Sequence, residues 1–119
     1  MKAIRQAVID IGSNTVRLVV YAGLPRAPMP IYNEKSRVAL GACLASDGII
    51  SDATMAKALA AIARFETLAR SMKVDMLRVV ATAATREAKN GHKLVEGAAA
   101  LGIRVDVLDG DTEATAAGL

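Results

Sequence analysis

Three polar clusters carry the residue types in this sequence that could perform chemistry. The first is Asp10, followed by Gly12, Ser13 and Asn14. A carboxylate at the end of a strand can bind a divalent ion, and a tight turn can direct backbone N–H groups and hydroxyls at a phosphate. A plain hairpin turn would use Gly and Asn for its geometry alone. This cluster therefore leaves two interpretations open, a phosphate-binding loop and a structural turn.

The second cluster lies in the segment ATAATREAKNG, where Thr82 and Thr85 precede Arg86. A guanidinium group suits bidentate contact with phosphate, and the two hydroxyls add hydrogen-bond donors. The alternative is that Arg86 is solvated and that Thr85 only caps a helix.

The third cluster lies in the segment LDGDTEATAAGL, where Glu113 falls in the first turn of a predicted helix. A carboxylate there could take a proton from a water molecule that attacks a bound phosphate. The alternative is a capping role, because Glu is frequent at the third helical position and Asp109 and Asp111 suit a helix start.

The elements that must position these clusters follow from the hydrophobic pattern. Short apolar runs predict strands, and a spacing of three to four residues with Ser51 as N-cap predicts a long amphipathic helix. A loop over 23–30 contains all the prolines, and a further helix starts after Asp109. The predicted strands are 4–11, 15–22, 31–40, 76–82 and 103–108, and the predicted helices are 52–72, 85–90 and 92–101.

This order predicts an α/β fold with a mixed five-stranded sheet and helices on its faces. The first three strands pair as an antiparallel meander, and the last two lie parallel to the first because each follows a helical crossover. The three polar clusters come where the first, fourth and fifth strands end. Parallel strands bring those ends to one edge of the sheet, so the convergence favours a ligand site.

The composition indicates a globular protein without membrane spans or a secretion signal. The chain has 119 residues, 53% of them hydrophobic and 23% charged, which fits one globular domain or part of one. Every long apolar run is interrupted before the roughly 18 residues that a membrane span needs, and the N-terminus lacks the pattern of a secretion signal. We therefore expect a protein without a membrane partner.

Cysteine usage and charge add two expectations. Cys43 is alone, so no internal disulfide can form, and we expect a small buried side chain in a cytoplasmic protein. The net charge of +3 fits an anionic ligand. The aromatic residues are few and scattered, and Lys and Arg are spread along the chain, so we expect no nucleic-acid partner.

The three motifs together resemble a known family. In their order and spacing, VIDIGSNTVRLVVY, VVATAATREAKNG and VDVLDGDTEATAAGL are similar to the N-terminal part of the exopolyphosphatase and guanosine pentaphosphate phosphohydrolase (Ppx/GppA) family. That family belongs to the actin-like ATPase superfamily, so the resemblance implies a ribonuclease H-like sheet. It covers essentially the whole chain. It also implies that residues 1–119 are the N-terminal portion of a longer phosphatase domain, whose second phosphate loop would follow Leu119.

The resemblance implies a role for each candidate residue. Residues 12–14 would form the first phosphate loop, Arg86 would lie near the bound phosphates, and Asp10 would be a carboxylate of the phosphate site or one linked to a metal ion. Glu113 would be the general base, Mg²⁺ the cofactor, and inorganic polyphosphate or guanosine pentaphosphate (pppGpp) the substrate. The resemblance leaves a homodimer open and implies that this fragment by itself is inactive.

The chain departs from the family pattern around the predicted base. The family usually has a second acid and an arginine there, where this chain has Thr112 and Thr115. Two alternatives therefore stay open. One is a phosphotransferase of the same superfamily, such as a sugar or carboxylate kinase, and the other is a non-catalytic regulator that binds guanosine polyphosphates.

Overall fold

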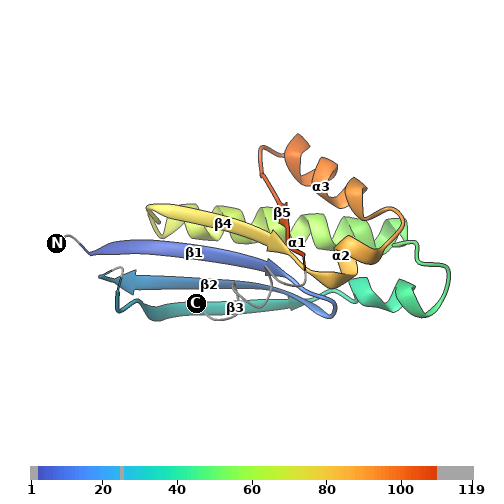
Figure 1. The fold of residues 1–119 in the computed structure, drawn as a ribbon. Coiled ribbons are helices and arrows are strands. Elements are labelled where there is room, and N and C mark those ends of the chain that lie inside the picture. The colour runs from blue at the N-terminus through green and yellow to red at the C-terminus, as the bar shows by residue number, and fades with distance from the viewer. Residues whose placement is uncertain (1–2, 25, 110–119) are drawn as a thin grey trace.

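The computed structural model describes residues 3–24 and 26–109, which form a twisted five-stranded sheet with helices packed against it (Figure 1). The strand order is β3-β2-β1-β4-β5. The elements are β1 (Ile4–Ile11), β2 (Thr15–Gly23), β3 (Met29–Arg37), the 3₁₀ helix η1 (Leu40–Ala45), α1 (Asp52–Ser71), β4 (Met76–Ala81), α2 (Ala83–Glu87), α3 (Gly91–Ala100) and β5 (Asp106–Val107).

The strand pairing confirms the predicted topology. β1 is antiparallel to β2, β2 is antiparallel to β3, and β4 is parallel to β1, with β5 parallel to β4. The alternation of apolar residues explains which face is buried: Ala7, Ile9 and Ile11 of β1 point into the core, whereas Asp10 is exposed. The predicted α/β mixed sheet is therefore correct.

The described helices α1 and α3 cover the same face of the sheet and contact each other (Figure 1). The crossovers from β3 to β4 and from β4 to β5 run in the same direction across the sheet. Crossovers between parallel strands are almost always right-handed, so two that run in one direction place their helices on one side.

The long helix α1 begins as the sequence predicts. Ser51 is its N-cap, and the Ser51 hydroxyl accepts a hydrogen bond from the Thr54 amide at 3.1 Å. The apolar stripe faces the sheet, with Ile62 and Phe65 fully buried. Burial of an apolar side chain of this size stabilises the fold by about 1.5–3 kcal/mol. Within the described residues, no helix is long and apolar enough to cross a membrane.

The prediction of a third strand over 31–40 is wrong at both ends. The strand begins at Met29 and includes Pro30, which an edge strand tolerates because one side of its backbone needs no ladder partner. It ends at Arg37 because the amides of Val38 and Gly41 donate to Asn14 and Ser13 instead, which turns the chain into η1.

The fifth strand is shorter than the predicted 103–108. Only Asp106 and Val107 pair with β4. The preceding residues Ile103 and Val105 are buried in the core beneath α3, and the Ile103 amide closes the end of that helix by donating to Ala98. Their apolar character comes from core packing, which the alternation of the sequence could not distinguish from strand pairing.

Candidate functional site

The carboxyl ends of β1, β4 and β5 meet at one edge of the sheet, as the sequence predicts. Ile11 lies opposite Ala81, and Ala81 lies opposite Val107. The Thr82 amide donates to the Ile11 carbonyl at 3.1 Å, and the Leu108 amide donates to the Ala81 carbonyl at 2.9 Å. The chain segments that carry the first two polar clusters therefore start side by side, and the segment that leads to the third starts next to them.

Positive φ does not explain the residues of the β1–β2 hairpin tip, residues 12–15, although a Cβ atom at Gly12 would lie 3.3 Å from the Thr15 carbonyl oxygen. The Gly12 amide donates to the Thr15 carbonyl at 2.9 Å and closes the turn. Neither Gly12, Ser13 nor Asn14 has a positive φ. Tight hairpin turns usually select Gly and Asn because they require positive φ. The purely structural explanation of these residues is therefore weakened.

The Ser13 and Asn14 carbonyls of the hairpin tip accept hydrogen bonds, whereas the amides of the same two residues have no acceptor among the described residues. The Ser13 and Asn14 carbonyls accept hydrogen bonds from Gly41 and Val38, both at 2.9 Å. Among the residues that the structure describes, the Ser13 and Asn14 amides have no hydrogen-bond acceptor, and both residues are exposed. Two adjacent backbone donors on a fixed turn form the type of site that binds an anion.

Gly41 holds the tip in place, and sequence reasoning missed it. A Cβ atom at this position would lie 3.0 Å from the Ser13 Cβ atom. The absence of a side chain thus allows η1 to approach the tip closely enough for the Gly41 amide to reach the Ser13 carbonyl. A lone glycine after a predicted strand gave no signal for this role.

The second cluster lies on the short helix α2. Arg86 is exposed, and its Nη1 atom donates to the Leu108 carbonyl at 2.6 Å, so the guanidinium group bridges to the chain that follows β5. A guanidinium group has five N–H donors, so it can contact more than one acceptor. The Thr82 hydroxyl donates to the Ile11 carbonyl at 3.4 Å.

Thr85 does not cap a helix, contrary to the alternative that the sequence left open. The N-cap position of α2 is Thr82, and Thr85 lies within the helix with only 3% of its surface exposed. The Thr85 hydroxyl is buried without a hydrogen-bond partner among the described residues. The helix is packed closely there, because a Cβ atom at Gly91 would lie 1.8 Å from the Thr85 carbonyl oxygen.

A pair of hydrogen bonds from Asn90 fixes the loop before α1 to the α2–α3 junction. The Ile50 amide donates to Asn90 Oδ1 at 2.8 Å, and Asn90 Nδ2 donates to the Ile50 carbonyl at 2.9 Å. The Lys89 amide also donates to the Gly48 carbonyl at 2.7 Å. Sequence reasoning missed Asn90, whose position before Gly91 at a helix start suggests an N-cap instead.

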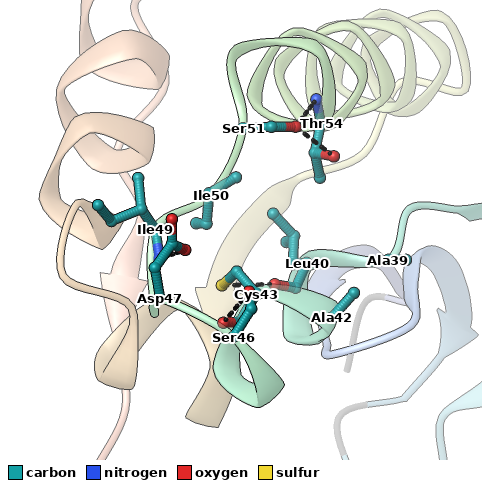
Figure 2. A pocket seen from close by; sticks show the side chains of 10 residues that line it. All are labelled: Ala39, Leu40, Ala42, Cys43, Ser46, Asp47, Ile49, Ile50, Ser51 and Thr54. Carbon is teal, nitrogen blue, oxygen red and sulfur yellow. Dashed lines mark hydrogen bonds between the residues drawn. The ribbon is translucent and has the colours of Figure 1, made fainter.

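Figure 2 shows a cavity of about 340 Å³ between η1, this loop and the start of α1. Cys43 lines it and is half-buried, so the predicted burial of this side chain is only partial; its thiol donates to the Leu40 carbonyl at 3.3 Å. The hydroxyls that line the cavity serve the backbone or each other: Ser46 donates to the Cys43 carbonyl, and Ser51 donates to the Thr54 hydroxyl. We therefore assign the residues that line this cavity a structural role.

Asp10 lies at the end of β1, on the face of the sheet opposite to α1, and its neighbour across the hairpin is Arg17. Among the described residues, no three His, Cys, Asp or Glu side chains form a metal-binding group. One carboxylate beside the hairpin tip nevertheless fits Mg²⁺, which is often bound through one or two carboxylates together with water and phosphate oxygens. Glu113 lies outside the described residues.

The strand order and the polar hairpin at the carboxyl edge define an α/β domain of the ribonuclease H-like, actin-like ATPase type. A sequence profile of the Ppx/GppA phosphatase family matches residues 19–119, and the chain belongs to this family.

Relatives with known structures share the fold over nearly the whole chain. A Ppx/GppA family member from Aquifex aeolicus is 26% identical, with a TM-score of 0.88 over 94% of this chain and 37% of that protein. An exopolyphosphatase from Cytophaga hutchinsonii is 31% identical, with a TM-score of 0.83 over 93% of this chain and 36% of that protein.

A curated relative is the guanosine-5'-triphosphate,3'-diphosphate pyrophosphatase of Pseudoalteromonas translucida, which is 29% identical over 109 residues. That match spans 91% of this chain and 22% of the relative. The chain thus corresponds to about a fifth of the length of this curated relative.

Proposed function

We propose that this chain supplies one wall of the active site of a phosphohydrolase that releases the terminal phosphate of inorganic polyphosphate or of pppGpp. The observation that carries the proposal is the hairpin tip, whose carbonyls are bound to η1 and the end of β3 while the Ser13 and Asn14 amides have no acceptor among the described residues. Membership of the Ppx/GppA phosphatase family supports hydrolysis over phosphoryl transfer to a sugar or carboxylate.

The terminal phosphate in this proposal is bound between the hairpin tip and α2. The Ser13 and Asn14 amides bind its oxygens from one side. Arg86, already oriented by its bond to the Leu108 carbonyl, binds them from the other. Backbone and guanidinium donors that are fixed before the substrate arrives stabilise the negative charge of the transition state without reorganising during the reaction.

Asp10 is the residue proposed to hold Mg²⁺ beside the phosphate loop. The ion would neutralise charge on the phosphoryl oxygens when bound. Glu113 is proposed to orient the attacking water and accept its proton, so that the phosphoanhydride bond breaks as the new P–O bond forms.

The test is Mg²⁺-dependent release of phosphate from long-chain polyphosphate and from pppGpp, measured on the natural full-length protein. We expect Glu113→Gln to lower the rate by about 10²–10⁴-fold, the contribution of a general base. Glu96→Gln, which removes an exposed carboxylate from α3, serves as the control and should leave the rate unchanged. Equal rates for the wild type and Glu113→Gln would refute the assigned base.

A second function has one sequence observation in its favour. Thr112 and Thr115 stand where the family pattern has an acid and an arginine. A non-catalytic regulator would bind pppGpp without releasing phosphate. Tight binding without turnover in the same assay would support this second function over hydrolysis.

A further inference from the structure

The outer edge of β5 has no pairing partner among the residues that the structure describes. In the strand order β3-β2-β1-β4-β5, β5 is the last strand and pairs with β4 on one side only. The Leu108 amide donates to the Ala81 carbonyl on that side. Because the backbone groups of successive strand residues point in opposite directions, the Val107 amide points away from β4. The Val105 amide has no acceptor within the described part of the chain. Such an edge is a template for a further strand.

The run that forms this edge, residues 103–107, has a self-complementary sequence. It reads Ile-Arg-Val-Asp-Val, with apolar residues at the centre and both ends, a cation at Arg104 and an anion at Asp106. In an antiparallel pair of two identical copies centred on Val105, Arg104 of each copy lies opposite Asp106 of the other. In the same register, the apolar residues at the two ends lie opposite each other. Opposite charges that face each other across antiparallel strands stabilise the pair.

Both charged side chains of the run are accessible to a second copy. The Arg104 side chain is 90% exposed and the Asp106 side chain 40% exposed. Within one chain they form an ion pair, with 3.3 Å between Arg104 Nε and Asp106 Oδ1. An ion pair at this exposure contributes little to stability, and a guanidinium group can contact more than one acceptor. Arg104 is therefore able to contact Asp106 of a second copy.

A hollow beside this edge fits an apolar side chain of the second copy. It has a volume of about 260 Å³, and its lining includes the apolar side chains of Val95, Ala99, Ile103 and Val105. Val107 lies opposite Ala81, on the face of the sheet that α1 and α3 cover, yet it is 42% exposed. The antiparallel register brings Val107 of the second copy opposite Ile103, next to the hollow. The two-fold axis repeats the same contact on the other copy.

We propose that residues 103–107 form an interface at which two copies of this protein pair through the outer edges of β5, antiparallel and around a two-fold axis at Val105. The partner is a second copy because this edge complements itself in charge and in the position of its apolar residues. The other edge strand, β3, is a poorer template because Pro30 has no amide proton to donate. The inference goes beyond the proposed function and uses none of the residues assigned to phosphate binding.

Charge-reversed variants of the 119-residue chain test the register. Arg104→Asp leaves two acids on the edge, and Asp106→Arg leaves two arginines. Sedimentation equilibrium at low salt measures dimerisation of the wild type, of each variant and of their equimolar mixture. We expect each variant alone to dimerise about tenfold more weakly than the wild type, because two attractive cross-strand pairs become repulsive. The mixture should recover the affinity of the wild type by forming a heterodimer, in which every cross-strand pair joins opposite charges.

The matched control reverses the charges of Glu66 and Arg70, an ion pair within α1. Arg70→Glu, Glu66→Arg and their mixture change the net charge by the same amounts as the β5 variants, so they correct for the overall field. We expect all three to dimerise as the wild type does. Circular dichroism checks that every variant is folded.

Three results would overturn the inference. If the wild type stays monomeric at the concentration of an NMR sample, the edge is not an interface between copies. If the two β5 variants dimerise as the wild type does, the copies meet elsewhere. If their mixture stays as weak as each variant alone, or if the control variants show the same losses, the antiparallel register is wrong. None of these results bears on phosphate release, which tests the proposed function separately.

Discussion

Arg86 connects the two halves of the candidate site at the scale of single residues. Its guanidinium group donates to the Leu108 carbonyl after β5, while its backbone amide bonds to Thr82 after β4. Lysine keeps the charge but has no planar fork of donors, so it cannot hold Leu108 and a phosphate in the same arrangement.

We therefore predict that Arg86→Lys weakens tripolyphosphate binding by about tenfold or more, because each charge-assisted hydrogen bond contributes about 1.5–3 kcal/mol. Isothermal titration calorimetry on the 119-residue chain measures this, with Arg104→Lys, an exposed arginine before β5, as the control. Full affinity in Arg86→Lys would show that Arg86 contributes only its charge.

Thr85 supplies a second prediction at this scale. Its hydroxyl is buried without a partner among the described residues, and such a group costs about 1–3 kcal/mol. Valine has nearly the same shape without the hydroxyl. We expect Thr85→Val to raise the free energy of unfolding by about 1 kcal/mol in urea denaturation. A loss of stability would instead mean that bound water or ligand pairs with this hydroxyl.

At the scale of elements, the junction between α2 and α3 holds the loop before α1 through Asn90. Asn90→Ala removes both hydrogen bonds to Ile50. The Ile50 amide and carbonyl then have no partner in a partly buried position. We predict a loss of about 2 kcal/mol in the free energy of unfolding. Asn33→Ala, at an exposed position of β3, is the control and should change stability little. Equal effects of the two substitutions would contradict the role of Asn90.

Two glycines of α3 give a matched pair of substitutions. A Cβ atom at Gly91 would meet the backbone of Thr85 at 1.8 Å, whereas one at Gly97 would meet the end of the Leu59 side chain at 2.8 Å. Backbone cannot move aside as a leucine tip can. We predict that Gly91→Ala lowers the free energy of unfolding by about 3 kcal/mol and displaces α2, whereas Gly97→Ala changes it by less than about 1 kcal/mol.

Thermal or urea denaturation of the Gly91→Ala and Gly97→Ala variants tests this contrast. Similar unfolding free energies for the two would mean that α2 is not held against the start of α3. The contrast matters for the site because α2 carries Arg86.

The sequence allowed the order and direction of the elements to be predicted, because those follow from local periodicity and from the handedness of crossovers. The ends of β3 and β5 could not be predicted. They depend on bonds between distant segments, such as Val38 to Asn14, and on Ile103 packing under α3. The convergence of Gly12 with Thr82 was predictable because it follows from the strand order.

The supports of the site were not predictable for the same reason. Gly41 acts through its contact with Ser13, and Asn90 acts through its hydrogen bonds to Ile50. In each pair the two residues are distant in sequence. A periodic pattern reports which face of an element is buried, but it does not report which backbone groups a side chain reaches. The roles of Asp10 and Glu113 stay predictions.

At the scale of the whole molecule, one sheet edge gathers donors from segments that are far apart in the chain. The hairpin tip comes from the first fifteen residues, and Arg86 comes from the segment after β4. The proposed function places the terminal phosphate at this edge.

The most direct test of the central claim is an NMR titration of the ¹⁵N-labelled 119-residue chain with tripolyphosphate in the presence of Mg²⁺. We predict saturable shifts of the Ser13 and Asn14 amide signals and of the Arg86 Nε signal, with the Arg104 Nε signal unchanged. If tripolyphosphate binds while the Ser13 and Asn14 amides do not shift, the hairpin tip is not a phosphate loop and the account of this site is wrong.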